Sequence, residues 1–332
     1  MEYYYLIIVV VLFALAISDL IVGVSNDAVN FLNSAIGSKA APLKVIIAVA
    51  ALGILVGATF SNGMMEVARK GIFHPDKFFF NEIMIIFLAV MITDIILLDL
   101  FNTFGLPTST TVSIVFELLG SAVAVSVVKI SRAAESITEL SNYINSDRAL
   151  AIISGIFLSV IVAFTVGAII QWLIRIFFSF NVKKTLKYWG GIWGGIALSG
   201  IMYFLLIKGA KSASFMSDET AKLIHDNQLR IILYSFLSGT ILFQLLLLFT
   251  RINILKIIVL LGTFALAMAF AGNDLVNFIG VPLAGFESFK AFSSSGAEPG
   301  GMLMEILTEP VRTPTLFLLI AGAVMALTLR YS

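Results

Sequence analysis

The sequence has no cysteine and only two histidines among its 332 residues. Without cysteine there can be no disulfide, haem–thiolate or iron–sulfur chemistry, and a redox function is not expected. His74 and His225 lie far apart in charged segments and do not predict a metal site. Charged residues make up only 12 %, whereas about a quarter is usual in soluble proteins. The net charge of +1 gives no broad field that would recruit nucleic acid.

Long apolar segments occupy most of the chain. Hydrophobic residues make up 59 % of it, and the mean hydropathy is +1.03. A membrane-spanning helix needs about 20 mostly apolar residues, and helices satisfy their own backbone polar groups in lipid. Windows of that length lie at 4–25, 43–63, 82–101, 149–174, 188–208, 229–249, 253–271 and 313–329, with a shorter one at 111–128. The sequence therefore predicts an all-α, polytopic helical bundle in a lipid bilayer.

A polar motif appears twice within these apolar segments. Asn26 to Phe31 reads NDAVNF and Asn273 to Phe278 reads NDLVNF, which gives five identities in six positions at a constant offset of 247. Glycine precedes each copy, at Gly23 and Gly272. Two copies in this arrangement indicate a duplicated fold.

The polar side chains of the repeated motif are costly inside a membrane and need a polar partner there. In a helix Asn26 and Asn30 share one face, four residues apart. These amides could simply join neighbouring helices, and the glycines could allow close packing. An ionisable aspartate in each copy, Asp27 and Asp274, favours a functional role instead.

A third motif, GLPTSTTVS, lies between the two copies at 105–113. Proline is tolerated at the start of a helix, and serine and threonine are preferred N-cap residues. A helix is therefore predicted to begin near Ser109, with hydroxyl groups at Thr108, Ser109, Thr110 and Thr111. The unpaired N–H groups and the dipole of a helix N-terminus suit an anion.

Together these three motifs resemble the signatures of the inorganic phosphate transporter (PiT) family. The resemblance implies two inverted repeats with broken helices at 23–37 and 271–285, a hydroxyl-rich helix start at 107–113, and a substrate site at mid-membrane between the repeats. The expected organisation is a first repeat at 1–130, an amphipathic connector with further transmembrane helices at 131–250, and the start of a second repeat at 251–332. No second hydroxyl motif precedes Ser332, so the second repeat is expected to be incomplete at its C-terminal end.

Phosphate is an anion, yet the three motifs contain two aspartates and no lysine or arginine. Cations are therefore expected beside the anion, and hard oxygen ligands suit sodium. Protons on the aspartates are the alternative, and sulfate or arsenate could replace phosphate. The candidate phosphate ligands are Asn26, Ser109, Thr110, Thr111 and Asn273. The candidate sodium ligands are Asp27, Asn30, Asp274 and Asn277.

Asp94 and Glu117 also lie inside apolar windows. They could form an additional ion site or gate, or could merely be bundle-facing groups hydrogen-bonded to backbone. The expected function is import of phosphate with sodium ions by alternating access in a prokaryotic inner or plasma membrane. An anion channel is less favoured because the polar motifs do not form rings along a pore. An enzyme is not expected, since no histidine lies within an apolar window. The apolar surfaces could face lipid or a second subunit.

Overall fold

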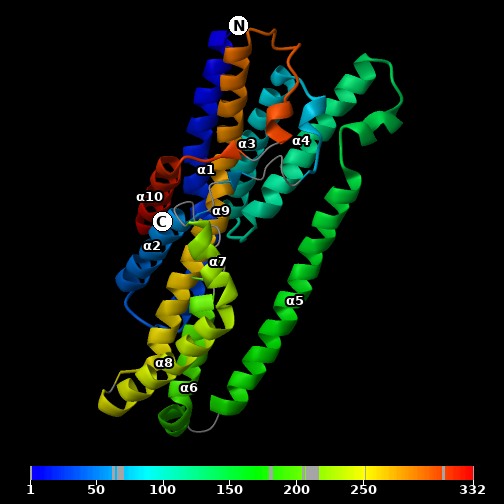
Figure 1. The fold of residues 1–332 in the computed structure, drawn as a ribbon. Coiled ribbons are helices and arrows are strands. Elements are labelled where there is room, and N and C mark those ends of the chain that lie inside the picture. The colour runs from blue at the N-terminus through cyan, green and yellow to red at the C-terminus, as the bar shows by residue number, and fades with distance from the viewer. Residues whose placement is uncertain are drawn as a thin grey trace. The chain divides into compact units, whose positions relative to one another are not determined.

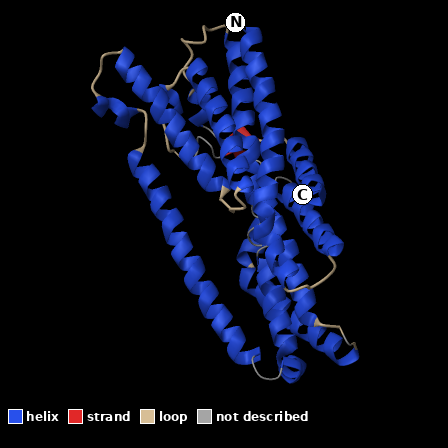
Figure 2. Ribbon diagram, turned by 180° about the vertical axis from the view of Figure 1, so that it is seen from behind, coloured by secondary structure: helices blue, strands red, loops and turns tan. Residues whose placement is uncertain are grey.

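The computed structural model describes residues 2–61, 64–65, 71–178, 182–203, 206, 217–250, 252–308 and 311–331. Almost all of this chain is helical (Figures 1 and 2). The α-helices are α1 (Glu2–Gly37), α2 (Leu43–Phe60), α3 (Phe80–Thr103), α4 (Thr110–Arg132), α5 (Ser146–Phe178), α6 (Val182–Met202), α7 (Asp218–Asp226), α8 (Gln228–Phe249), α9 (Ile254–Ser295) and α10 (Thr315–Tyr331).

Short elements connect some of these helices. In the described ranges they include the 3₁₀ segments η1 (Pro75–Lys77), η2 (Ile137–Asn142) and η5 (Glu305–Thr308). Strands β1 (Met64–Met65) and β2 (Val311–Arg312) pair antiparallel, with Met64 opposite Arg312 and Met65 opposite Val311. These elements lie between apolar helices.

The predicted transmembrane bundle is confirmed. Within the described residues, six helices are long and apolar enough to cross a membrane: α1, α3, α4, α5, α8 and α9. The prediction was wrong about the window 111–128, because α4 extends past its apolar part through Lys129 to Arg132 and is long enough to span. The chain is a multi-pass membrane protein.

The expectation of broken helices at 23–37 and 271–285 was wrong. Helix α1 runs without interruption for 36 residues and α9 for 42, each through its copy of the polar motif. Asparagine and aspartate need not interrupt the hydrogen bonds of a helix backbone where their side chains find partners on other segments. Asn26 and Asp274 both have such partners, in the loop before α4 and on α4.

The segment between α4 and α5 is a short turn and not a long helix. Helix α4 ends at Arg132, η2 follows, and α5 begins at Ser146. Ser136 accepts a hydrogen bond from the Thr138 N–H at the start of η2, which favours a short turn there. Ser217 caps α7 by accepting from the Thr220 N–H.

The chain divides into two compact units that alternate along the sequence. The first comprises Met1–Val29, Gly63–Ile156 and Asn273–Ser332, and the second comprises Asn30–Asn62 and Phe157–Gly272. The core of the first unit is aromatic: the rings of Phe80 and Phe292 stack 4.2 Å apart, and Tyr5 packs against both. The three sequence segments expected as repeats and connector remain a prediction.

Close helix packing characterises the second unit. There α6 and α8 meet where a side chain at Gly195 would come within 2.1 Å of the Thr240 Oγ1 atom and 2.7 Å of the Phe236 carbonyl. Small residues at membrane helix interfaces allow backbones to approach in this way. Only glycine fits at position 195.

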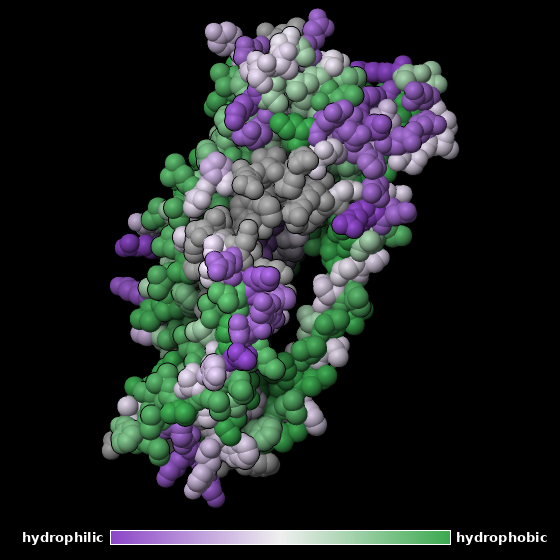
Figure 3. Space-filling view, viewed as in Figure 1, coloured by the Kyte–Doolittle hydropathy of each residue, from purple (hydrophilic) through white to green (hydrophobic). Residues whose placement is uncertain are grey.

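Helix α5 presents an almost wholly apolar surface (Figure 3). Phe157, Ile161, Phe164 and Trp172 are among its exposed side chains. Exposed apolar side chains along a helix are expected where lipid replaces water as the surrounding medium.

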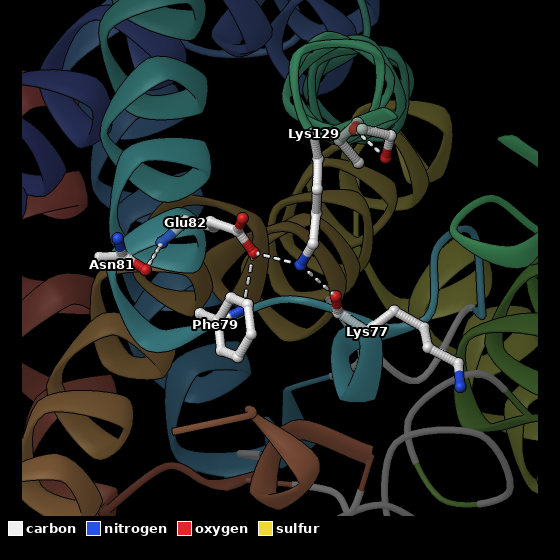
Figure 4. Close-up of polar contacts among 7 residues, drawn as sticks. Lys77, Phe79, Asn81, Glu82 and Lys129 are labelled. Carbon is white, nitrogen blue, oxygen red and sulfur yellow. Dashed lines mark hydrogen bonds and ion pairs between the residues drawn. The ribbon is translucent and has the colours of Figure 1, made fainter. Parts of the chain in front are cut away.

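Lys129, near the end of α4, joins α4 to the start of α3 (Figure 4). Its Nζ atom donates to the Glu82 carboxylate and to the Lys77 carbonyl, both at 2.9 Å. The same Glu82 oxygen accepts from the Phe79 N–H at 2.8 Å and so caps α3. The ammonium group also lies 4.3 Å from the centre of the Phe79 ring. One lysine thus binds a carboxylate, a carbonyl and an aromatic face.

Replacing Lys129 by methionine is expected to lower the free energy of unfolding by about 1–2 kcal/mol. The methionine keeps most of the apolar stem but loses the ion pair and the cation–π contact, each worth about 0.5–1 kcal/mol when partly exposed. Thermal unfolding in detergent, followed by tryptophan fluorescence, measures the change. Lys77→Met is the matched control, because only the backbone carbonyl of Lys77 takes part. Equal unfolding temperatures for the two variants would contradict the assignment.

Candidate ion and anion site

Within the first unit, α1 packs against α9 at the start of the first polar motif. The two helices run in opposite directions (Figure 1). Residues later in α1 contact residues earlier in α9. The contacts in order are Tyr5 with Phe292, Leu12 with Gly285 and Gly23 with Phe278. A methyl group at Gly23 would lie 2.2 Å from the Phe278 ring. Gly23 therefore allows the close approach of the two motif-bearing helices.

The Asn26 side chain holds the loop that precedes α4. Its Nδ2 atom donates to the Leu106 carbonyl at 3.0 Å and to the Asn102 Oδ1 atom at 2.9 Å. Its Oδ1 atom accepts from the Thr108 N–H at 2.8 Å. Asn102 in turn donates to the Val22 carbonyl of α1, so Asn26 and Asn102 together form a clamp between α1 and the loop. The first motif thereby fixes the position of the GLPTS loop.

Helix α4 begins where its sequence predicts. Ser109 is the N-cap, and its Oγ atom accepts from the Val112 N–H at 3.4 Å. Gly105 adopts a left-handed conformation, with φ of +65°, where the chain turns toward the helix start. Thr110, the first helical residue, is buried. The first-turn N–H groups have no carbonyl partner within the helix and point toward whatever lies before it.

The hydroxyl motif meets the second copy of the polar motif directly. Thr111 Oγ1 donates to the Asp274 carboxylate at 2.9 Å. Asn277 Nδ2 donates to the Thr111 hydroxyl oxygen at 2.9 Å and to the same Asp274 oxygen at 3.1 Å. Three side chains from α4 and α9 therefore form one hydrogen-bonded group around a carboxylate. Thr111 lies 163 positions before Asp274 and 166 before Asn277 in the sequence.

The remaining predicted ligands differ in their exposure. Asp27 is buried in α1, next to the clamping Asn26. Ser109 and Asn273 are exposed, at the start of α4 and on α9. Asn30 is exposed and belongs to the second unit, whereas the other candidate ligands belong to the first.

Asp94 and Glu117 share a hydrogen-bonding partner, Ser113, that was not among the predicted site residues. Ser113 Oγ hydrogen-bonds Asp94 and contacts Glu117 Oε1 at 2.7 Å, and all three side chains are buried. Asn102 and Ser113 were not among the predicted ligands, although Ser113 lies four residues before Glu117 on the same helix face. That spacing was the available signal.

Comparison with known proteins places this architecture in a family. The phosphate transporter family model matches residues 23–329. The chain belongs to the phosphate transporter family. Two proteins named "Putative phosphate permease" are each 25 % identical to this family member over 82 % of its chain, one from Thermococcus kodakarensis and one from Pyrococcus furiosus. The matched region spans 64 % of the length of each of these relatives.

A solved structure described as "The sodium-dependent phosphate transporter" has the same fold as this transporter family member. The TM-score is 0.71 at 20 % sequence identity, and the match covers 97 % of this chain and 74 % of the other. The family resemblance inferred from the three motifs is thereby confirmed, as is the helical transmembrane fold.

Proposed function

We propose that the protein is a secondary active transporter that imports inorganic phosphate together with sodium ions. The observation that carries this proposal is the contact of Thr111, at the N-terminus of α4, with Asp274 and Asn277 of α9. A helix N-terminus suits an anion, and a carboxylate beside it suits a cation. Phosphate and sodium at adjacent positions would satisfy both.

In the proposed site, phosphate binds at the first turn of α4. The Thr110 and Thr111 N–H groups and the hydroxyls of Ser109, Thr110 and Thr111 are the donors, with Asn273 approaching from α9. Asn26 keeps the loop in place, and would donate to phosphate only by exchanging one of its bonds to the loop.

Sodium ions in the proposed site bind between phosphate and the two aspartates. Asp27 and Asp274 supply the negative charge, while Asn277 supplies an amide oxygen. Without a cation, phosphate beside two carboxylates would be repelled. Binding of one ion therefore favours binding of the other, which is the thermodynamic basis of symport.

Alternating access would move the two inverted repeats around this site. The opposite directions of α1 and α9 support an inverted relation between the two motif copies. A prokaryotic inner or plasma membrane is the proposed location. The apolar face of α5 would contact lipid or, in a homo-oligomer, a second copy of the chain.

Uptake of radiolabelled phosphate into proteoliposomes tests the proposal. An inward sodium gradient is expected to drive saturable accumulation that persists when a proton uncoupler is added. Potassium replacing sodium on both sides should reduce uptake to the level of protein-free vesicles, and excess sulfate should compete poorly.

Three outcomes would contradict this proposal. Uptake that collapses with the uncoupler at a constant sodium gradient would favour proton coupling. Equal competition by sulfate would assign a broader oxyanion specificity. Flux that only equilibrates phosphate across the membrane would indicate a channel.

A further inference from the structure

A second polar group is buried between α3 and α4, apart from the Thr111–Asp274 contact. It consists of Asp94 from α3 and of Ser113 and Glu117 from α4. On α4, Thr111 and Ser113 are two residues apart and point to different sides of the helix. Asp94 is fully buried, and Ser113 and Glu117 are at most 8 % exposed.

Counting hydrogens indicates that this group holds a proton. The Ser113 hydroxyl lies within hydrogen-bonding distance of a carboxyl oxygen of Asp94 and of one of Glu117. A hydroxyl has only one hydrogen to donate, and an ionised carboxylate has none. Two such contacts require two hydrogens, so at least one of the carboxyl groups must carry one.

Asp19 of α1 supplies a further reason to expect bound protons. Its side chain is completely buried, and both of its oxygens lack a hydrogen-bond donor among the described residues. The charges of Asp19 and Asp94 would act on each other if both carboxyl groups were ionised. An ionised carboxylate left without a donor at this depth would cost several kcal/mol. A shared proton removes that cost.

The surrounding charges do not neutralise the group. Asp19, Asp94 and Glu117 are the titratable side chains that act on one another here. On α4, Lys129 lies twelve residues beyond Glu117, or about 18 Å along the helix axis, and is paired with Glu82. On α9, Asp274 is bound to Thr111 on another side of α4. In the described part of the chain, no group of three or more acidic or histidine side chains has an arrangement suited to a metal ion.

A cavity lies beside the group. It has a volume of about 430 Å³ and is lined by Thr93, Phe101, Thr108, Ser113, Glu117 and Ser121, among others. Thr108 belongs to the hydroxyl motif, so the same cavity reaches from Glu117 to the loop held by Asn26. Glu117 therefore borders a cavity that also reaches the hydroxyl motif.

We propose that Asp19, Asp94, Ser113 and Glu117 form a proton-binding site that is separate from the phosphate and sodium site. The site holds at least one proton at neutral pH and exchanges it through the cavity beside Glu117. Proton binding by these residues does not depend on the proposed transport function. Its consequence for uptake does, because a proton bound next to α4 stabilises the helix whose N-terminus is proposed to hold phosphate.

Infrared spectroscopy of the complete protein in lipid tests proton binding directly. A protonated carboxyl group gives a carbonyl-stretching band that an ionised one lacks. The wild-type protein is expected to show this band at neutral pH and to lose it at alkaline pH. Glu117→Gln and Asp94→Asn should each remove or shift the band. Asp99→Asn is the matched control, because Asp99 is an exposed acid on α3, and it should leave the band unchanged.

Two infrared results would overturn the proposal. One is the absence of a protonated-carboxyl band in the wild-type protein at neutral pH. The other is a band that persists unchanged in Asp19→Asn, Asp94→Asn and Glu117→Gln. Because the wild-type spectrum needs no variant, a variant that fails to fold does not prevent the test.

Sodium-driven uptake provides a second measurement. Uptake by Glu117→Gln is divided by wild-type uptake at each pH, with the same sodium gradient. Protonation of phosphate affects both proteins equally, so it does not change this ratio. This ratio should rise from mildly acidic to alkaline pH, because glutamine stays neutral while Glu117 loses its proton. The infrared band could be lost at alkaline pH as expected while this ratio stays constant. That result would overturn the proposed link between proton binding and uptake. Failure of sodium-driven uptake in the wild type would instead count against the proposed function alone.

Discussion

Replacing Asp274 by asparagine is expected to weaken the apparent sodium affinity of phosphate uptake by about ten- to a hundred-fold. The Asn277 and Thr111 contacts both use one oxygen of Asp274, and an asparagine oxygen can accept both bonds. Packing should therefore persist while the charge is lost. Interactions with charged groups are worth about 1.5–3 kcal/mol, and each 1.4 kcal/mol is a factor of ten in affinity. The sodium dependence of initial uptake rates measures the change.

Asp27→Asn should shift the sodium dependence in the same direction, because Asp27 is the equivalent residue of the first motif copy. Asp99→Asn serves as the control for loss of an acid from a membrane helix, and should leave the sodium dependence unchanged. If both motif variants kept wild-type sodium dependence and were correctly folded, the aspartates would have only a packing role.

Replacing Asn26 by leucine is expected to reduce phosphate uptake by about a hundred-fold while destabilising the protein by only about 2 kcal/mol. The variant loses three side-chain hydrogen bonds, to Asn102, Leu106 and Thr108. Such bonds contribute about 0.6 kcal/mol each in a membrane protein. The functional effect is larger because a displacement of about 1 Å in a binding group can cost about a hundred-fold. The loop that Asn26 holds sets the start of α4.

The experiment for Asn26 pairs thermal unfolding with initial uptake rates. Asn33→Leu is the control, since Asn33 is an exposed asparagine on the same helix. It should change neither quantity appreciably. A loss of uptake in Asn26→Leu that matched its loss of folded protein would reduce the residue to a structural role. Unchanged uptake would show that the loop does not need the clamp.

Features specified by neighbouring residues could be predicted from the sequence. The apolar windows located the transmembrane helices, and the Pro-Thr-Ser sequence placed the start of α4 within one residue of Thr110. A capping serine and a fixed proline act over a single turn, so no tertiary information is needed. The duplicated motif likewise marked two distant segments, and the structure packs Gly23, just before the first copy, against Phe278 of the second.

Features that depend on contacts between distant segments could not be predicted in the same way. The sequence does not reveal that Asn26 binds the backbone of Leu106 and Thr108, 80 or more residues away. This contact is also consistent with the continuous helix α1, because the Asn26 side chain bonds to another segment and leaves the backbone hydrogen bonds of the helix intact. Asp19 was visible as an acid in an apolar segment, but its complete burial depends on how α1 packs against other helices.

Pro282 lies inside α9, one turn beyond Phe278. Its ring nitrogen carries no hydrogen, so the Phe278 carbonyl has no helical donor four residues later. A long helix bends most readily where such a backbone hydrogen bond is missing. The ring of the same residue, Phe278, lies against Gly23. The point of least bending resistance in α9 therefore lies next to Asn277. A hinge at this position would let the end of α9 tilt while Asp274 and Thr111 stay joined, so that a change of shape need not break the hydrogen bond between them.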